Sequence, residues 1–314
     1  FKGWVGFSGA TFKGGAVFLV ATFEQLAGFS GATFKGWVGF SGATFKGGAV
    51  FYDAHFDFFA DFSYATFSRP ELVVFCESSN RRNVSRSSFL YVEGLDRFVI
   101  RDAYWAGSVE ELKQRFKGGS SGGSRYVVYD EVRLDRRVRG EREPEYVTLD
   151  AVLSVYRMLR RNLDSRARYF ESGKLFISEM EVQRLFREES GEVIRNGWLR
   201  RNLSFIGLYR HISLYGESYV RPLVVSALLI PFFALLRWVE HDVIPWVLGM
   251  IASGLDPNVV ALFKAVWSYL TTAASSYLPY AFTGITDALE KIAAAVIIGN
   301  LVIALRRRFE RRIR

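Results

Sequence analysis

Residues 1–67 carry large aromatic side chains at a strict, short interval. Thirteen phenylalanines follow one another at alternating steps of six and five positions, so that one step of each makes a repeating unit. Two positions before each of them, after the first, lies a small residue that is alanine in all but two cases. This period fits neither an α-helix nor an ordinary strand. It predicts a solenoid in which each short side turns one large and one small residue inward, so that two units complete one four-sided coil.

The phenylalanines of this frame are the expected solenoid core: Phe7, Phe12, Phe18, Phe23, Phe29, Phe34, Phe40, Phe45, Phe51, Phe56, Phe62 and Phe67. The segment FSGATF, at residues 7–12, 29–34 and 40–45, resembles the pentapeptide-repeat family. The resemblance implies a right-handed quadrilateral β-solenoid over residues 1–69. The chain departs from the family by an extra residue in every second unit, which we expect to loosen alternate corners. The alternative, a disordered Gly/Phe tract, conflicts with twelve unbroken intervals.

An internal copy suggests that the repeat array is longer than the sequence given. Residues 1–18 recur identically as residues 34–51, an offset of three units. Because the chain also lacks an initial methionine, we expect it to be a piece of a longer repeat protein.

The middle of the chain mixes predicted strands with a linker. The β-rich runs ELVVFC, FLYVEG and RFVIRDAYW lie in residues 70–117, and we expect them to cap or extend the solenoid. Residues 118–147 begin with GGSSGGS, the composition of a flexible linker, either native or engineered. The run RYVVYDEVRL that follows it predicts one more strand.

Residues 148–218 form a basic segment with helical periodicity. Thr148 is the predicted N-cap of a helix whose apolar positions are Leu149, Val152, Leu153, Tyr156, Leu159 and Leu163. Further helix is expected at about 165–188 and 192–216. The segments YRMLRRNL, ISEMEVQR and LYRHISLYGES resemble the helical linker of archaeal and cyanobacterial pentapeptide-repeat membrane proteins. A small helical bundle with a solvated basic face is the simpler interpretation, and the two are compatible.

The last third, residues 219–314, is the most apolar part of the chain. It predicts membrane spans at about 219–239 and 288–306, with a re-entrant or interfacial helix at about 258–278. Three spans are the alternative, but two spans place both basic flanks on the cytoplasmic side, as the positive-inside rule requires. We therefore expect a cell-membrane protein with both termini cytoplasmic. Arginines that would meet anionic lipid headgroups or fix this topology are Arg221, Arg306, Arg307, Arg308, Arg311 and Arg312.

The order span, short helix, loop and span is similar to that of two-span ion channels. The residues that would line a pore or a helix interface are Thr283, Gly284, Asp287, Ala295, Gly299 and Asn300. The Thr-Val-Gly-Tyr-Gly filter pattern is absent, which argues against potassium selectivity. A packing role is the more common explanation for Asn300, and the small pair Ala295 and Gly299 favours helix association.

Composition narrows the partners and the chemistry. Half of the 314 residues are hydrophobic, which excludes a mainly disordered chain, and the single Cys76 excludes a disulfide framework. The net charge of +9 first suggests nucleic acid, but residues 1–67 are neutral and the arginines gather beside the predicted spans. We therefore expect no nucleic-acid partner. Because no catalytic motif appears, we also expect no enzyme activity, no cofactor and no metal.

The sequence thus predicts a multidomain β + α protein with a β-solenoid, a helical linker and an α-helical transmembrane domain. Its expected function is that of an oligomeric, membrane-anchored scaffold whose cytoplasmic solenoid binds a protein partner. The alternative is an ion-channel-like pore with a regulatory solenoid. Arginine outnumbers lysine 32 to 9, which together with the archaeal resemblance hints at a thermophile.

Overall fold

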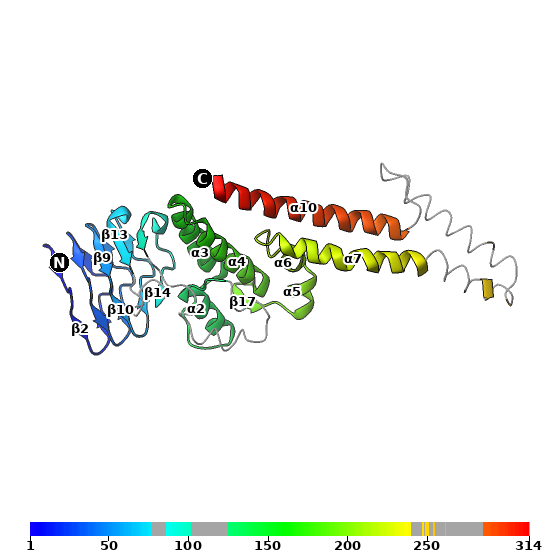
Figure 1. Ribbon diagram of the computed structural model, residues 1–314. Coiled ribbons are helices and arrows are strands. Elements are labelled where there is room, and N and C mark those ends of the chain that lie inside the picture. Colours follow the sequence, from blue (N-terminus) through cyan, green and yellow to red (C-terminus); the bar gives the residue numbers. More distant parts are fainter. Residues whose placement is uncertain are drawn as a thin grey trace. The chain divides into compact units, whose positions relative to one another are not determined.

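The computed structural model describes residues 1–76, 86–101, 125–239 and 285–313, and positions 247, 249, 250, 254 and 261. The chain divides into two compact units, Phe1–Gly207 and Leu208–Ile313. The first unit contains the solenoid and a group of helices that follows it, and the second is helical (Figure 1).

In the described residues, four short parallel sheets form the four sides of the solenoid (Figure 1). The first contains β1 (Val5–Gly6), β5 (Ala27–Gly28), β9 (Ala49–Tyr52), β13 (Val73–Cys76) and β15 (Val99–Arg101). The second contains β2 (Thr11–Phe12), β6 (Thr33–Phe34) and β10 (His55–Phe56). The third contains β3 (Ala16–Val17), β7 (Val38–Gly39), β11 (Ala60–Asp61) and β14 (Ser87–Ser88), and the fourth β4 (Thr22–Phe23), β8 (Thr44–Phe45) and β12 (Thr66–Phe67). Val5 pairs with Ala27 and Ala27 with Ala49, so the predicted coil of two repeating units is confirmed.

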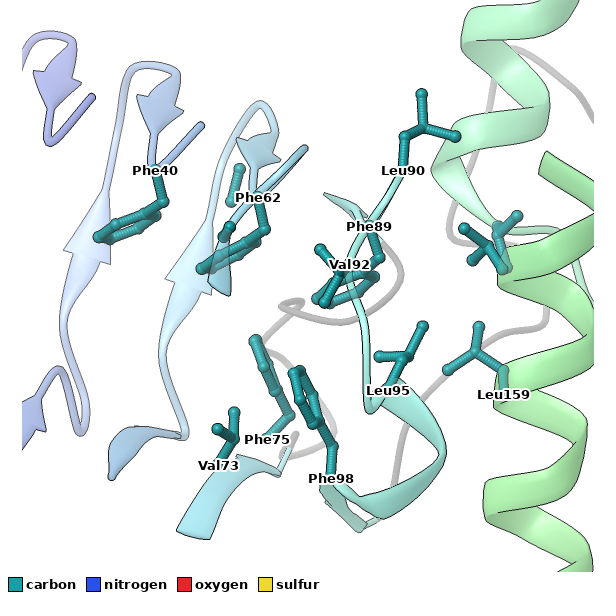
Figure 2. Close-up of a cluster of buried hydrophobic side chains, with 14 of the residues drawn as sticks. Phe40, Phe62, Val73, Phe75, Phe89, Leu90, Val92, Leu95, Phe98 and Leu159 are labelled. Carbon is teal, nitrogen blue, oxygen red and sulfur yellow. The ribbon is translucent and has the colours of Figure 1, made fainter. Parts of the chain in front are cut away.

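The phenylalanine rings stack in columns, one behind each sheet. Their centroids are 4.6 Å apart for Phe12 and Phe34, 4.7 Å for Phe23 and Phe45, and 4.8 Å for Phe40 and Phe62. These separations equal the spacing of hydrogen-bonded strands, so each ring meets its equivalent in the next coil. Rings from the opposite first and third sheets meet edge to face, and together with the inward alanines they fill the interior. Figure 2 shows one column continuing from Phe40 through Phe62 to Phe89.

Two kinds of corner alternate along the solenoid and explain the alternating steps of five and six. Each shorter step contains one residue with positive φ, and at Gly9, Gly31 and Gly42 this residue is glycine, as the turns require. In the other shorter steps Val20, Asp53 and Tyr64 take the same conformation. The extra residue, by which this chain differs from the five-residue repeat, therefore lies in the corners of the longer steps. The described backbone has no positive φ in those corners.

The end of the array keeps the predicted strands only in part. ELVVFC forms β13 and RFVIRDAYW contributes β15, as expected. FLYVEG forms no strand. It follows β14 as a loop whose residues Phe89, Leu90 and Val92 are buried. The 3-10 turns Pro70–Leu72 and Leu95–Arg97 complete this last coil.

The helices of the first unit are α2 (Tyr129–Val138), α3 (Leu149–Ser165), α4 (Tyr169–Leu185) and α5 (Trp198–Leu203). The Thr148 side chain accepts a hydrogen bond from Ala151 N at 3.2 Å, which confirms the predicted cap of α3. Two predictions are wrong. RYVVYDEVRL contributes to helix α2 rather than a strand, and residues 192–216 open with the second strand of a hairpin, β16 (Phe186–Glu189) and β17 (Glu192–Arg195). The hairpin turn holds Ser190 and Gly191 at positive φ, a conformation that a continuous helix excludes.

The second unit contains α7 (Val220–Trp238) and α10 (Ile285–Ile313), which lie side by side, and most of α6 (Phe205–Ser213) (Figure 1). Among the described residues, no helix has both the length and the apolarity to cross a membrane. The stretch without charge in α7 runs over positions 222–236, between Arg221 and Arg237, and that in α10 over positions 292–305. At a rise of about 1.5 Å per residue these stretches span roughly 22 Å, short of the ~30 Å hydrocarbon core.

The predicted transmembrane domain is therefore wrong, and with it the fold class that contained it. The described chain is a β-solenoid followed by helices. The prediction of a pore depended on the same spans and is not supported. The re-entrant helix expected at 258–278 lies outside the described residues apart from position 261.

Replacing one stacked ring should destabilise the whole coil. Phe40 is fully buried between Phe18 and Phe62 in its column. For Phe40→Ala we expect a loss of about 3–5 kcal/mol in the free energy of unfolding, because the cavity cannot close between fixed coils. The exposed Phe58 is the control, and Phe58→Ala should change stability little. Urea denaturation of the two variants measures both effects, and equal losses would contradict the stacked core.

Candidate interaction site at the capped end of the solenoid

The last coil of a solenoid exposes apolar rings and backbone groups that a further coil would otherwise cover. Helix α3 packs across this end of the chain. Leu95 of the last coil points toward Leu159 of α3, and both are buried (Figure 2). The apolar face that the sequence predicted for α3 is therefore the lid of the phenylalanine core.

Side chains of the helices take the place of the missing strand ladder. The buried Asn162 donates from Nδ2 to the carbonyl oxygens of Leu95, at 3.1 Å, and Phe98, at 2.6 Å. The Asp130 carboxylate of α2 accepts a hydrogen bond from Phe89 N at 3.0 Å. Buried backbone groups that would otherwise cost free energy are thus satisfied by the cap.

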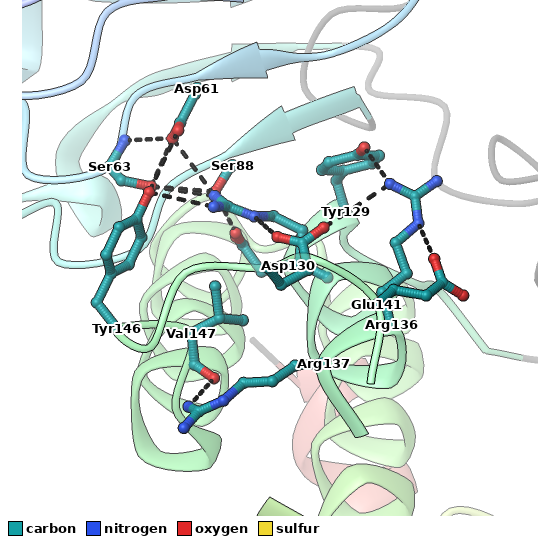
Figure 3. Close-up of polar contacts among 12 residues, drawn as sticks. Asp61, Ser63, Ser88, Tyr129, Asp130, Arg136, Arg137, Glu141, Tyr146 and Val147 are labelled. Carbon is teal, nitrogen blue, oxygen red and sulfur yellow. Dashed lines mark hydrogen bonds and ion pairs between the residues drawn. The ribbon is translucent and has the colours of Figure 1, made fainter. Parts of the chain in front are cut away.

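Arg133 of α2 is the centre of a buried polar cluster between α2 and the third sheet. Its Nη1 donates to Ser88 Oγ at 2.6 Å and reaches Asp61 Oδ1 at 3.4 Å. Its Nε donates to Glu143 Oε2 at 3.0 Å, and its Nη2 to the Tyr146 hydroxyl at 3.2 Å. Figure 3 shows Asp61, Ser88 and Tyr146 converging on this point from the sheet and from the loop after α2.

Burial and neighbouring charges shift the pKa values of the ionisable groups in this cluster. Removal from water raises the pKa of Asp130 to about 6, although hydrogen bonds from Ser88 and Phe89 N and the nearby Arg133 lower it. Burial alone would lower the pKa of Arg133, but attraction to Asp61 and Asp130 outweighs it, so that pKa is raised. Arg133 therefore stays charged, whereas the Asp130 carboxyl changes its protonation state at about pH 6.

A second buried group ties α2 to α3. The Arg125 guanidinium binds Glu131 through two hydrogen bonds, at 2.6 and 3.2 Å, and the Tyr156 hydroxyl donates to the same carboxylate. Burial, and then the charge of Glu131, raise the pKa of Tyr156 well above its usual value, which keeps the hydroxyl protonated. This group and the Arg133 cluster together fix α2 against both of its neighbours.

Sequence reasoning missed Asp130, Glu131 and Arg133 because it assigned residues 125–134 to a strand. Asp130, Glu131, Arg133 and Asp135 are all buried in α2. Four charges within six positions are incompatible with a buried strand, and this density was the signal available in the sequence. The side chains of this cluster are buried and bond to one another, so we interpret the cluster as one that stabilises the packing of α2 on the solenoid. In the described part of the chain, no group of three or more His, Cys, Asp or Glu side chains is arranged to hold a metal ion.

The other predicted site residues are the phenylalanines of the solenoid core and the candidate pore or helix-interface residues. Phe23 to Phe62 of the expected core are fully buried, and Phe7, Phe12 and Phe18 in the first coil are half-buried. Thr283 and Gly284 lie outside the described residues. In α10, Asp287 pairs with Lys291 at 2.8 Å, while Ala295 and Gly299 are exposed.

Asn300 and the arginines also have definite positions. Asn300 accepts a hydrogen bond from Ser213 Oγ at 3.0 Å and donates to Val296 O, so it joins α6 to α10. Arg221 donates to the carbonyl oxygen of Arg210, and Arg306 is exposed. Arg307, Arg308, Arg311 and Arg312 lie along the last turns of α10.

Comparison with known proteins supports the solenoid. Residues 1–44 match the family model described as pentapeptide repeats in nine copies. No curated protein and no solved structure matches the chain significantly.

Removing the central cation should loosen the cap. For Arg133→Met we expect a loss of about 3–5 kcal/mol in the free energy of unfolding, because Asp61 and Glu143 are left without their buried partner. Arg187 forms a partly exposed pair with Glu189 at 2.7 Å, so Arg187→Met should cost less than ~1 kcal/mol. Chemical denaturation of both variants measures these losses. Similar losses in the free energy of unfolding would contradict a stabilising role for the buried Arg133 cluster.

Stability should depend on pH through Asp130. A folded-state pKa raised from 3.8 to about 6 means that the native state binds this proton more tightly than the unfolded chain does. Its contribution is therefore greatest below pH 4, falls as the pH rises to about 6 and is level above that, by at most ~3 kcal/mol. Asp130→Asn removes this dependence, whereas Asp150→Asn, at an exposed position, should keep it. Urea unfolding at pH 4 and pH 7 tests this, and parallel pH profiles for wild type and Asp130→Asn would refute it.

Proposed function

We propose that this chain, in which residues 1–44 are pentapeptide repeats, is an assembly scaffold with a protein-recognition surface on its solenoid. The observation that carries the proposal is the solenoid interior, which stacked rings fill completely from Phe23 to Phe62. A ligand can therefore be met only by the outer faces. The cap of α2 and α3 supports the proposal further, because it closes one end and holds the solenoid as a rigid body.

The helical unit supplies the means of assembly. Helices α7 and α10 expose apolar side chains along their length, among them Leu228, at 67%, and Ile298, at 59%. Ala295 and Gly299 lie exposed on α10, and a Cβ added at Gly299 would meet no atom within 4 Å. Apolar surface of this extent is typical of a buried interface, and small residues let helices approach closely. A second copy of the chain, presenting the same surface, is the partner that we propose for it.

The mass of the purified 314-residue chain in solution tests this assembly. We expect a discrete oligomer in sedimentation equilibrium at micromolar concentration, and a single-chain mass for the double variant Leu228→Glu with Ile298→Glu. Phe170→Glu replaces an equally exposed ring outside the α7–α10 pair and should leave the mass unchanged. A wild-type protein that sediments as one chain over the whole concentration range would overturn self-assembly.

A further inference from the structure

The outer face of the third sheet is divided into two halves of opposite character. The register places Val17, Gly39, Asp61 and Ser88 in one outward column across four coils. In the last two coils this face carries the polar residues Asp61 and Ser88, beside the single ring of Phe59. In the first two it is apolar and exposed, with Val17 at 59%, Leu19 at 50% and Trp37 at 44%. We call this apolar half, with Gly39 at its centre, the Trp37 face.

Glycines make the Trp37 face flat and continuous. A Cβ added at Gly39 would lie 2.7 Å from the Trp37 ring and 3.2 Å from Leu19 Cδ2, so both side chains close over this position. A Cβ added at Gly15 would lie 3.0 Å from Trp37 Nε1. The indole therefore lies along the sheet across two coils, and the exposed residues form one patch rather than isolated side chains.

The chain itself shows what this face accepts, because the polar half is already covered by a helix. Tyr129 of α2 stacks on Phe59 with ring centroids 5.1 Å apart and an interplanar angle of 14°. Phe59 follows Trp37 in the same outward column, one coil later, since Ala60 pairs with Val38. Arg133 of the same helix binds Asp61 and Ser88. The Trp37 face thus continues an interface that a helix occupies further along the solenoid.

Charge at the border of the patch specifies the partner. Lys13 and Lys35 are exposed at the corners that lead into β3 and β7, and within the described part of the chain neither forms an ion pair. Lys46, at a different corner, is paired with Glu24 at 3.0 Å. The next residue in the column of Lys13 and Lys35 is Asp57, which pairs with His55. Among the described lysines, the two exposed ones without an ion-pair partner at this corner, Lys13 and Lys35, therefore border the apolar half of the face.

From this geometry we propose that the Trp37 face docks an amphipathic helix of a protein partner, with acidic residues beside its apolar stripe. The stripe would cover Val17, Leu19 and Trp37, and the acidic residues would meet Lys13 and Lys35. This assignment rests on the proposed recognition role of the solenoid and adds to it the face and the chemistry of the partner.

Photo-crosslinking of the 314-residue chain in its native host locates the partner. We place p-benzoylphenylalanine at Val17 or Leu19, and at Thr33 and Thr44 on the second and fourth sheets of the same solenoid as controls. We expect adducts at Val17 and Leu19 whose crosslinked segment is an acidic amphipathic helix. The double variant Lys13→Glu with Lys35→Glu should abolish them, and Lys46→Glu should not.

Binding of the identified segment, made as a synthetic peptide, then gives the magnitude. We expect Trp37→Ala to weaken binding at least tenfold in fluorescence anisotropy. Trp4→Ala, at an exposed indole on the first sheet, should leave binding unchanged.

The outcomes separate this inference from the function on which it rests. Adducts at Thr33 or Thr44 alone would overturn the Trp37 face but leave recognition by the solenoid intact. Adducts between two copies of the chain would overturn the proposed partner in favour of self-association. Adducts at none of the four positions would count against recognition by the solenoid as well.

Discussion

The stacking of one phenylalanine ring on its equivalent in the next coil is the interaction on which the rest of the first unit depends. Centroid separations such as 4.6 Å for Phe12 and Phe34 hold the coils at the distance of hydrogen-bonded strands, so core and backbone ladder share one repeat. Because strands of two residues have little stability alone, the aromatic columns supply most of the cohesion. The same regularity fixes the outer faces, where each column of outward residues repeats at the strand spacing.

A stacked repeat leaves the apolar rings and backbone groups of its last coil uncovered, and the cap of α2 and α3 covers them. The last coil cannot be covered by another phenylalanine column, so α3 supplies leucines and Asn162 supplies hydrogen bonds to its carbonyl groups. Helix α2 adds Asp130 and Arg133, buried charges that are tolerated only because each has partners. Polar groups specify where the cap docks, and apolar contacts hold it there.

The two halves of the third sheet show how one surface serves two purposes. Asp61 and Ser88 receive the chain's own α2, whereas Trp37 and Leu19 remain exposed one to three coils earlier. From Leu19 to Asp61 the inward frame continues without a break, so the difference between these coils lies in the outward residues. A repeat fold can therefore vary recognition from coil to coil without altering its core.

The sequence by itself determined the solenoid, because alternating steps of five and six can be satisfied only if every fourth ring of the frame stacks, and it determined α3 through its cap and apolar spacing. It did not determine α2, since Asp130 and Arg133 find their partners 42 and 45 residues away, on a sheet edge that exists only after the coils have stacked. The apolar segments of the last third misled for the opposite reason. Hydropathy identified them, but their charge-free stretches are too short for a span, and only the tertiary structure shows that Asn300 bonds to Ser213. Periodic local contacts can be read from a chain, whereas partners distant in sequence are decided by the tertiary structure.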